Sequence, residues 1–175
     1  PMRASRDKAY MVADQRFAAG RPDVLCFTTE PLAGDVTFAG GIRAVLQAAI
    51  STTDADFVVK LIDVWPDNTE YPGYQMLVRG DIMRGRYRRS FSAPEPFTPG
   101  EPTEVAFTMP DIAHTFRKGH RIMVQVQSSW FPLADRNPQQ FVDIYRCAAS
   151  DFIPCDVRIY HDRRRPSRLE VLRLR

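Results

Sequence analysis

The sequence predicts an all-β protein, an antiparallel two-sheet sandwich of jelly-roll (galactose-binding-like) type with short helical turns. Short segments alternate apolar and polar residues with a period of two, as β-strands do. Turn signals rich in proline and glycine separate these segments at short intervals. No long segment repeats the i, i+3, i+4 pattern of an amphipathic helix, and strands without intervening helices favour antiparallel pairing.

The alternation is clearest in two segments, 42–50 and 57–64. In the first, Ile42 and Leu46 share an apolar face opposite Arg43 and Gln47. About nine short strands are expected in all, at 24–28, 36–39, 42–50, 57–64, 75–78, 104–109, 121–127, 157–160 and 169–174. Two further segments, 81–89 and 111–116, each have room for a short helical turn.

Most of the 14 prolines fall between the strands, at turn signals such as 65–68 and 98–102. A length of 175 residues suits one domain, which we place at 23–175. Residues 1–22 have no strand pattern and are expected to be an extended lead-in from an upstream domain. The chain begins with Pro1 instead of a start methionine, which predicts that it is a piece of a longer protein.

Composition excludes several classes of protein. Apolar residues make up 44% and charged residues 26% of the chain, as in ordinary globular proteins. The net charge of +3 depends on C-terminal arginines that alternate with apolar residues, which is typical of a solvated strand face and not of a nucleic-acid partner. No apolar run is long enough to span a membrane, and the N-terminus lacks the apolar core of a signal peptide.

The cysteines and paired acids allow few sites. Cys26 lies in an apolar run and is expected to be buried, whereas Cys147 and Cys155 could form a disulfide if the parent protein is exported. No histidine lies at metal-ligand spacing from them, so no zinc site is expected. Asp54 and Asp56 precede a strand and could contribute to a calcium site, but two acids are too few ligands, and turn capping is the commoner use. We therefore expect no metal and no cofactor.

The chain shows no catalytic triad. It has no G-x-S-x-G nucleophile elbow. His120 lies between a turn and a strand, where a structural hydrogen bond is its expected role. His161 precedes Asp162, which would make two thirds of a triad, but nothing connects the pair to a nucleophile. The segment SSWFPLADRNPQ, 128–139, gathers serines, an acid and an arginine, yet it lacks a base.

Four blocks of sequence resemble a known family. They are RPDVLCFTTEPL (21–32), TDADFVVKLIDVWPD (53–67), RGDIMRGRYRRSF (79–91) and KGHRIMVQVQSSWFPLADRNP (118–138). In this order they resemble the C-terminal domain of the X-Pro dipeptidyl-peptidase and cocaine esterase (CocE/NonD) group of serine hydrolases. Within that group, the resemblance is closest to the alpha-amino-acid ester hydrolases.

The resemblance implies a non-catalytic jelly-roll domain that packs on an upstream α/β-hydrolase domain and its helical cap, in the same polypeptide. The triad and oxyanion hole would lie upstream of Pro1, and the intact enzyme would act on small acyl esters or amides. The lead-in would pass near the acyl pocket, which Tyr10 and Met11 would help to line. Five residues of the segment 128–139 would pack against the other domains: Trp130, Phe131, Asp135, Arg136 and Asn137.

Several properties stay open at this point. The resemblance implies a bacterial parent, in which a periplasmic or secreted location would suit a disulfide, and homo-oligomers occur in the ester-hydrolase branch. Neither the location nor the oligomeric state can be read from the sequence. The alternative function is that of a free-standing carbohydrate-binding module, since the β-sandwich is a common scaffold for such modules. Exposed aromatic residues would then bind sugar, and the candidates are Trp65, Tyr71, Tyr74, Trp130 and Phe131.

Overall fold

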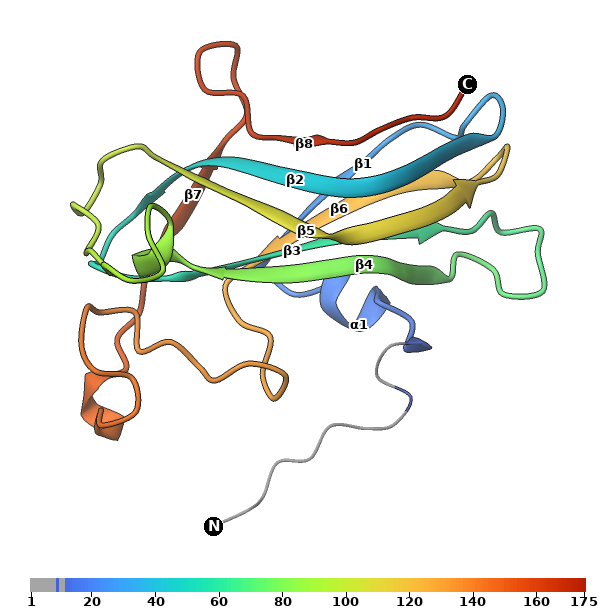
Figure 1. Ribbon diagram of the computed structural model, residues 1–175. Coiled ribbons are helices and arrows are strands. Elements are labelled where there is room, and N and C mark those ends of the chain that lie inside the picture. Colours follow the sequence, from blue (N-terminus) through green and yellow to red (C-terminus); the bar gives the residue numbers. More distant parts are fainter. Residues whose placement is uncertain (1–8, 10–11) are drawn as a thin grey trace.

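The computed structural model describes residue 9 and residues 12–175, which form a two-sheet β-sandwich (Figure 1). One sheet has the order β1-β6-β3-β4 and the other the order β5-β2-β7, with β8 also paired to β2. The strands are β1 (Val24–Thr28), β2 (Val36–Ile50), β3 (Asp56–Val64), β4 (Gln75–Arg84), β5 (Thr103–Phe116), β6 (Arg121–Gln127), β7 (Val157–Tyr160) and β8 (Arg168–Glu170). All pairings are antiparallel, which confirms the predicted fold class.

Two predicted strands, 36–39 and 42–50, are joined in the single long strand β2. The join is a β-bulge at which Gly40, with a φ of 90°, pairs with Ile112, and Ile42 pairs with Met109. Pro110 lies inside this irregularity, where its missing N–H breaks no regular ladder. The expected helical turn at 111–116 is therefore wrong, because β5 continues past the proline to Phe116.

The central strand β3 is buried on both faces. Phe57, Val59 and Leu61 point into the core between the sheets. Val58 and Ile62 point the other way, into a smaller apolar cluster on the outer face of the first sheet. This is the alternation that the sequence showed, but the outer face of β3 is covered too, by α1 and the segment after β6. The outer-facing side chains of β3 therefore lie in an interior.

Short helices lie at the margins of the sandwich. The lead-in, expected to be extended, contains the helix α1 (Arg16–Ala19), whose first turn is closed by hydrogen bonds to the Gln15 carbonyl. The segment 81–89 continues β4 to Arg84 and then forms the 3-10 helix η2 (Gly85–Tyr87), so the helical turn expected there is present only at its end. A further 3-10 helix, η3 (Ala149–Asp151), lies in the long connection between β6 and β7.

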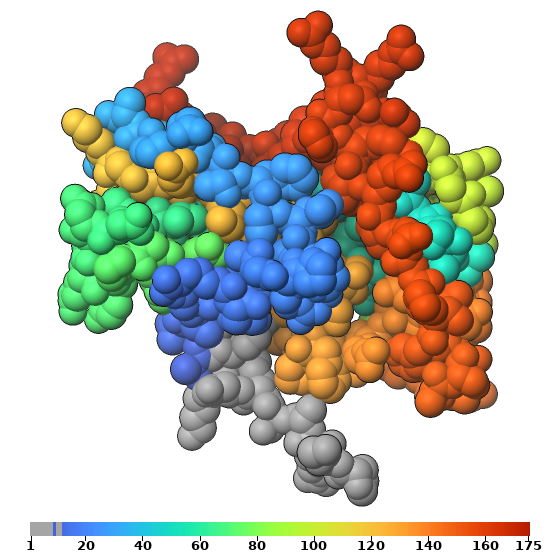
Figure 2. Space-filling view, turned by 180° about the vertical axis from the view of Figure 1, so that it is seen from behind, coloured from blue at the N-terminus to red at the C-terminus, as the bar shows by residue number. Residues whose placement is uncertain are grey.

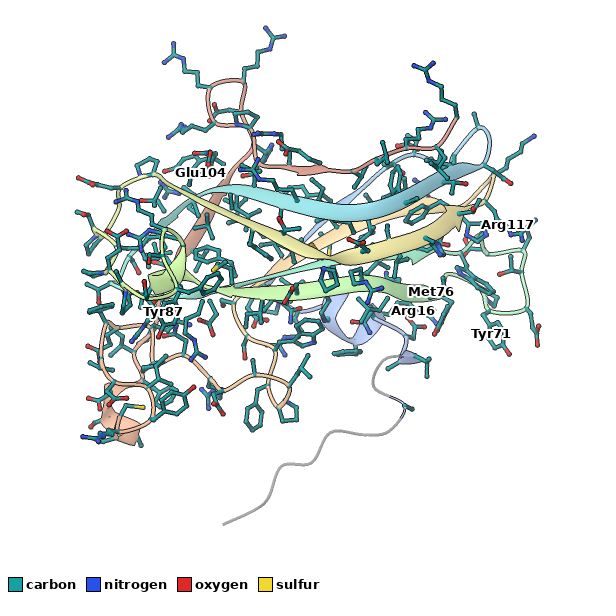
Figure 3. The ribbon with its side chains drawn as sticks, viewed as in Figure 1. Arg16, Tyr71, Met76, Tyr87, Glu104 and Arg117 are labelled. Carbon is teal, nitrogen blue, oxygen red and sulfur yellow. The ribbon has the colours of Figure 1, made fainter. Side chains whose placement is uncertain are left out.

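Loops gather at the two ends of the sandwich. Tyr71 and Arg117 lie at one end, and Tyr87 and Glu104 lie at the other (Figure 3). Among the described residues, no helix is long and apolar enough to cross a membrane. Cys26 was expected to be buried but is exposed, because β1 is an edge strand and only its first residue is buried.

Candidate functional site

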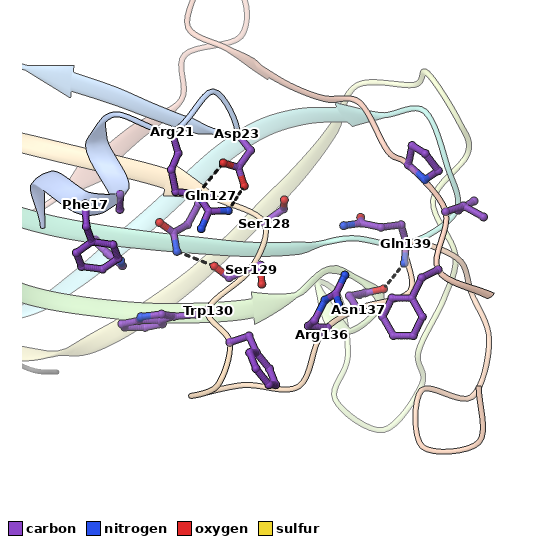
Figure 4. A pocket seen from close by; sticks show the side chains of 16 residues that line it. Phe17, Arg21, Asp23, Gln127, Ser128, Ser129, Trp130, Arg136, Asn137 and Gln139 are labelled. Atoms are coloured by element: carbon purple, nitrogen blue, oxygen red, sulfur yellow. Dashed lines mark hydrogen bonds and ion pairs between the residues drawn. The ribbon is translucent and has the colours of Figure 1, made fainter. Parts of the chain in front are cut away.

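The segment 128–139 leaves β6 and folds across the outer face of the first sheet (Figure 4). Trp130 is only 7% exposed and packs over Gly80 in the middle of β4. A Cβ atom at Gly80 would lie 2.6 Å from Cη2 of Trp130, so only glycine leaves room for the indole. Phe131, joined to Pro132 by a cis peptide bond, is 53% exposed. The two aromatic residues of the motif thus face in different directions, one into the domain and one out of it.

Asp54 and Asp56 form the centre of a buried polar network. Both are almost fully buried, at 0% and 2% exposure. Nε of Arg86 donates to Asp54 at 2.7 Å, and Nε of Arg84 donates to Asp56 at 3.2 Å. Burial raises the pKa of Asp56, while its hydrogen bonds with Asn137 and the charge of Arg84 oppose that rise. The acids are therefore not turn caps alone: they bind two guanidinium groups, one from the end of β4 and one from η2.

The same network holds the segment after β6 in place. Nδ2 of Asn137 donates to Asp54 at 3.0 Å and to Asp56 at 2.8 Å. The guanidinium groups also reach main-chain carbonyls of the segment: Arg84 donates to that of Asp135 at 3.1 Å, and Arg86 to that of Val142 at 2.8 Å. With both carboxylates committed in this way, they are not available to a calcium ion. Among the described residues, no group of three or more His, Cys, Asp or Glu is arranged to hold a metal ion.

A buried lysine lies beneath α1. Lys60, on the outer face of β3, is 1% exposed, and its Nζ donates to Oε1 of Gln15 at 3.0 Å. Its ammonium lies 5.3 Å from the centre of the Trp130 ring and 5.7 Å from that of Phe17. Burial first, and the charge of Arg21 second, lower its pKa from 10.5 to about 8. Residues from α1, from the segment 128–139 and from β3 therefore come together around one ammonium group.

A cavity of about 660 Å³ opens beside this lysine. One side comes from α1 and the turn that connects it to β1, and the other from the segments 127–139 and 152–154 (Figure 4). Arg21 and Asp23 form a bidentate ion pair in its wall. Arg136 lines it as well, with its guanidinium 5.1 Å from the centre of the Phe152 ring. This cavity, with cations and aromatic rings in its lining, is the candidate site.

The residues predicted for sites are only partly brought together. Tyr10 and Met11 lie outside the described residues, so their expected place at an acyl pocket stays a prediction. Asn137 is buried, whereas Asp135 and Arg136 are exposed and, among the described residues, form no ion pair with each other. Lys60 was missed as a site residue, although a lysine within an otherwise apolar strand was a visible signal.

The histidines form structural contacts. Nδ1 of His120 and Nε2 of His114 hydrogen-bond to the two carboxylate oxygens of buried Asp63, at 2.8 and 2.9 Å. The structural role expected of His120 is thus present, together with an unexpected second imidazole. His161 instead packs on the ring of Phe27, and Asp162 binds Arg165. In the described part of the chain no hydroxyl or thiol group hydrogen-bonds to these imidazoles, so a triad is not assembled there.

The aromatic residues proposed for sugar binding fall into two groups. Trp65, Tyr71 and Tyr74 pack against one another near the turn between β3 and β4, with ring centres 5.7 to 6.1 Å apart. Trp130 belongs to the segment 128–139 and lies over the middle of β4. The five residues therefore do not lie together, and Tyr71 in one group and Phe131 in the other are the exposed ones.

The cysteines are free thiols. Sγ of Cys147 donates a hydrogen bond to the carbonyl oxygen of Ile144. Sγ of Cys155 accepts one from the hydroxyl of Thr52, at 3.1 Å. The disulfide considered from the sequence is therefore absent in the structure.

Residues 3–170 match the family model of the X-Pro dipeptidyl-peptidase C-terminal non-catalytic domain. The chain belongs to this family. It is 44% identical over 125 residues to cocaine esterase from Rhodococcus sp. (strain MB1 Bresler), an alignment that covers 71% of this chain and 21% of the esterase. The X-Pro dipeptidyl-peptidase C-terminal domain described above thus corresponds to about a fifth of that relative's length.

Solved structures agree with this assignment. An aminopeptidase from a marine sediment archaeon, Thaumarchaeota archaeon, superposes with a TM-score of 0.92 at 44% identity, over 95% of this chain and 28% of the aminopeptidase. An alpha-amino acid ester hydrolase superposes with a TM-score of 0.90 at 47% identity, over 93% of this chain and 27% of the hydrolase. In both relatives, most of the polypeptide lies outside the domain that this chain represents.

Proposed function

We propose that this chain is the C-terminal domain of a serine hydrolase for small acyl esters or amides, and that it docks on the upstream hydrolase and cap domains. The observation that carries the proposal is the exposure of apolar side chains on the lead-in and on the segment 128–139, which meet at one cavity. The side chains are those of Val12, Phe17, Phe131 and Leu133, which are 69%, 57%, 53% and 41% exposed. We call these four residues the lead-in face.

The position of the lead-in face supports docking there. Phe17 and Phe131 come from opposite sides of the cavity beside Lys60. In the space-filling view, α1 and the start of β1 lie beside the orange segment after β6, on one side of the molecule (Figure 2). A group of exposed apolar side chains of this kind is typical of an interaction surface. Because the relatives carry the rest of their chain outside this domain, an upstream domain connected through the lead-in would reach this face first.

The buried polar network around Asp54 and Asp56 supports a second role for the domain, which is to hold part of the acyl pocket in position. Asn137, Arg84 and Arg86 bind the segment after β6 to the start of β3, the end of β4 and η2, and that segment carries Phe131. A rigid support of this kind would hold one wall of an acyl pocket in register with an upstream triad. Tyr10 and Met11 would complete that wall through the lead-in.

Docking is tested with Phe131→Ser in this chain alone and in the polypeptide extended by its upstream hydrolase domain. We expect a lower melting temperature only in the extended polypeptide, because Phe131 is exposed in the domain itself. Phe91→Ser is the matched control, since Phe91 is 79% exposed and lies after η2, outside the lead-in face. Equal effects of the two substitutions in the extended polypeptide would overturn the docking proposal.

The acyl-pocket role has its own test. Tyr10→Ala in the extended enzyme should change the ratio of kcat/KM values between small and large acyl esters more than it changes the melting temperature. Unchanged kinetics with a shifted melting temperature would assign Tyr10 to packing alone.

A further inference from the structure

The cavity beside Lys60 holds more positive charge than its own carboxylate can balance. Its lining contains Lys60, Arg21 and Arg136 but, within the described part of the chain, only one acid, Asp23. Asp23 is bound by Arg21 through both carboxylate oxygens. Neither Lys60 nor Arg136 has a carboxylate within 4 Å among the described residues.

This excess of positive charge affects Lys60 most directly, because its ammonium group is buried. A buried ammonium group is unfavourable unless an anion compensates it, and among the described residues its one hydrogen-bond partner is the neutral amide of Gln15. The pKa of Lys60 is lowered for the same reason, because burial and the charge of Arg21 disfavour its charged form. An anion placed in the cavity would favour the charged form of Lys60, and the same lining carries the exposed guanidinium of Arg136.

The opposite wall of the cavity combines aromatic rings with uncharged polar side chains. Trp130, Phe131 and Phe152 line it on the side away from α1. Its volume, about 660 Å³, is in the range of sites for small organic molecules. A ligand suited to it combines one negative group with an apolar or aromatic body, because the lining offers unbalanced cations and three aromatic rings, beside uncharged polar side chains that can accept or donate hydrogen bonds.

We propose that this cavity is a carboxylate-binding site, in which Lys60 and Arg136 bind the carboxylate and the aromatic walls bind the apolar group that carries it. The carboxylate has two possible sources. One is an acidic side chain of the upstream domain, and this source rests on the proposed function. The other is a free small carboxylate, which requires no docking.

Benzoate is the probe for this chain alone, and benzamide is its neutral match. The pKa of Lys60 is followed by NMR of the side-chain nitrogen and its neighbouring methylene group. Millimolar benzoate should raise that pKa from about 8 toward 10.5, and benzamide should leave it in place. Lys60→Met and Arg136→Gln should each weaken benzoate binding about tenfold or more, since hydrogen bonds between charged groups are the strong ones. Arg163→Gln, at an exposed arginine outside the lining, should not.

The extended polypeptide distinguishes the two sources. If the upstream domain supplies the carboxylate, the pKa of Lys60 is already raised there and added benzoate has no effect. If the site takes a free carboxylate, the pKa stays near 8 until benzoate is added. The proposal is overturned if neither benzoate in this chain nor the upstream domain in the extended polypeptide raises the pKa. A failure of docking would leave the benzoate result intact, so the two proposals fail separately.

Discussion

Asn137 donates a hydrogen bond of 2.8 Å to Asp56, across 81 residues of sequence, and both side chains are almost fully buried. The same amide nitrogen donates to Asp54, so a neutral group lies between two carboxylates that also bind Arg84 and Arg86. The network is close to balanced, with two acids and two guanidinium groups. Buried polar groups stabilise a fold only when all of them are satisfied, and here the amide completes the set.

Asn137→Asp should therefore be strongly destabilising. It adds a third carboxylate to a buried site whose two arginines are already committed, and it removes the two hydrogen bonds that the amide donates. We expect a loss of about 3 kcal/mol or more in the free energy of unfolding, measured by urea denaturation. Asn68→Asp makes the same change at an exposed turn and should stay within about 0.5 kcal/mol. A similar loss in both variants would mean that the network is not what the substitution disturbs.

The strands were predictable because their signal is local. The period of two in 57–64 correctly separates the two faces of β3, since neighbouring side chains point to opposite sides of a sheet. The strand predicted at 104–109 stops before Pro110, whereas β5 continues to Phe116, because the proline lies in a β-bulge where its missing N–H is tolerated.

The candidate site was less predictable because it depends on distant contacts. Asp54, Arg86 and Asn137 come from three segments, and no local pattern shows that they meet. The burial of Lys60 depends on α1 and Trp130 covering the outer face of β3, which periodicity alone cannot show. The family resemblance indicated that the segment 128–139 has a structural role. The structure shows that Trp130 packs on Gly80 and that Asn137 binds the two buried acids.

Gly80→Ala should displace Trp130 from its place on β4. The added Cβ would lie 2.6 Å from Cη2 of the indole, closer than real contacts allow. We expect a loss of about 1–3 kcal/mol in stability, as for other overpacked sites, together with a red shift of the tryptophan fluorescence. Gly34→Ala is the control, since nothing lies within 4 Å of a Cβ there. A stable variant with unchanged fluorescence would show that Trp130 does not require the glycine.

Asp63→Asn should weaken the contact of β3 with β5 and with the turn before β6. The carboxylate accepts a hydrogen bond from each of two imidazoles, whereas an amide offers one acceptor oxygen and leaves the second imidazole facing an N–H donor. We expect a loss of about 1–3 kcal/mol in the free energy of unfolding. Asp67→Asn, at an exposed turn, is the matched control. An equal, small effect in both would indicate that the imidazoles find other partners.

The buried lysine makes a prediction about pH. The pKa of Lys60 is about 8 in the folded protein and 10.5 is its ordinary value, so between these pH values the unfolded chain keeps a proton that the folded protein has released. Stability therefore rises with pH across this window, by at most about 3 kcal/mol from this one group. Below pH 8 the lysine is charged in both states, and the unfavourable contribution of its burial is complete.

Lys60→Met removes that contribution, so the stability of the variant relative to the unsubstituted chain should fall as pH rises from 8 to 10.5. Urea unfolding at several pH values in this window measures the difference. The offset between the two proteins is not the test, because the substitution also leaves Gln15 without its donor. Lys118→Met, at an exposed lysine, shows what the loss of a surface ammonium group does. If the two variants follow the same course with pH, Lys60 is not the buried cation that the structure shows.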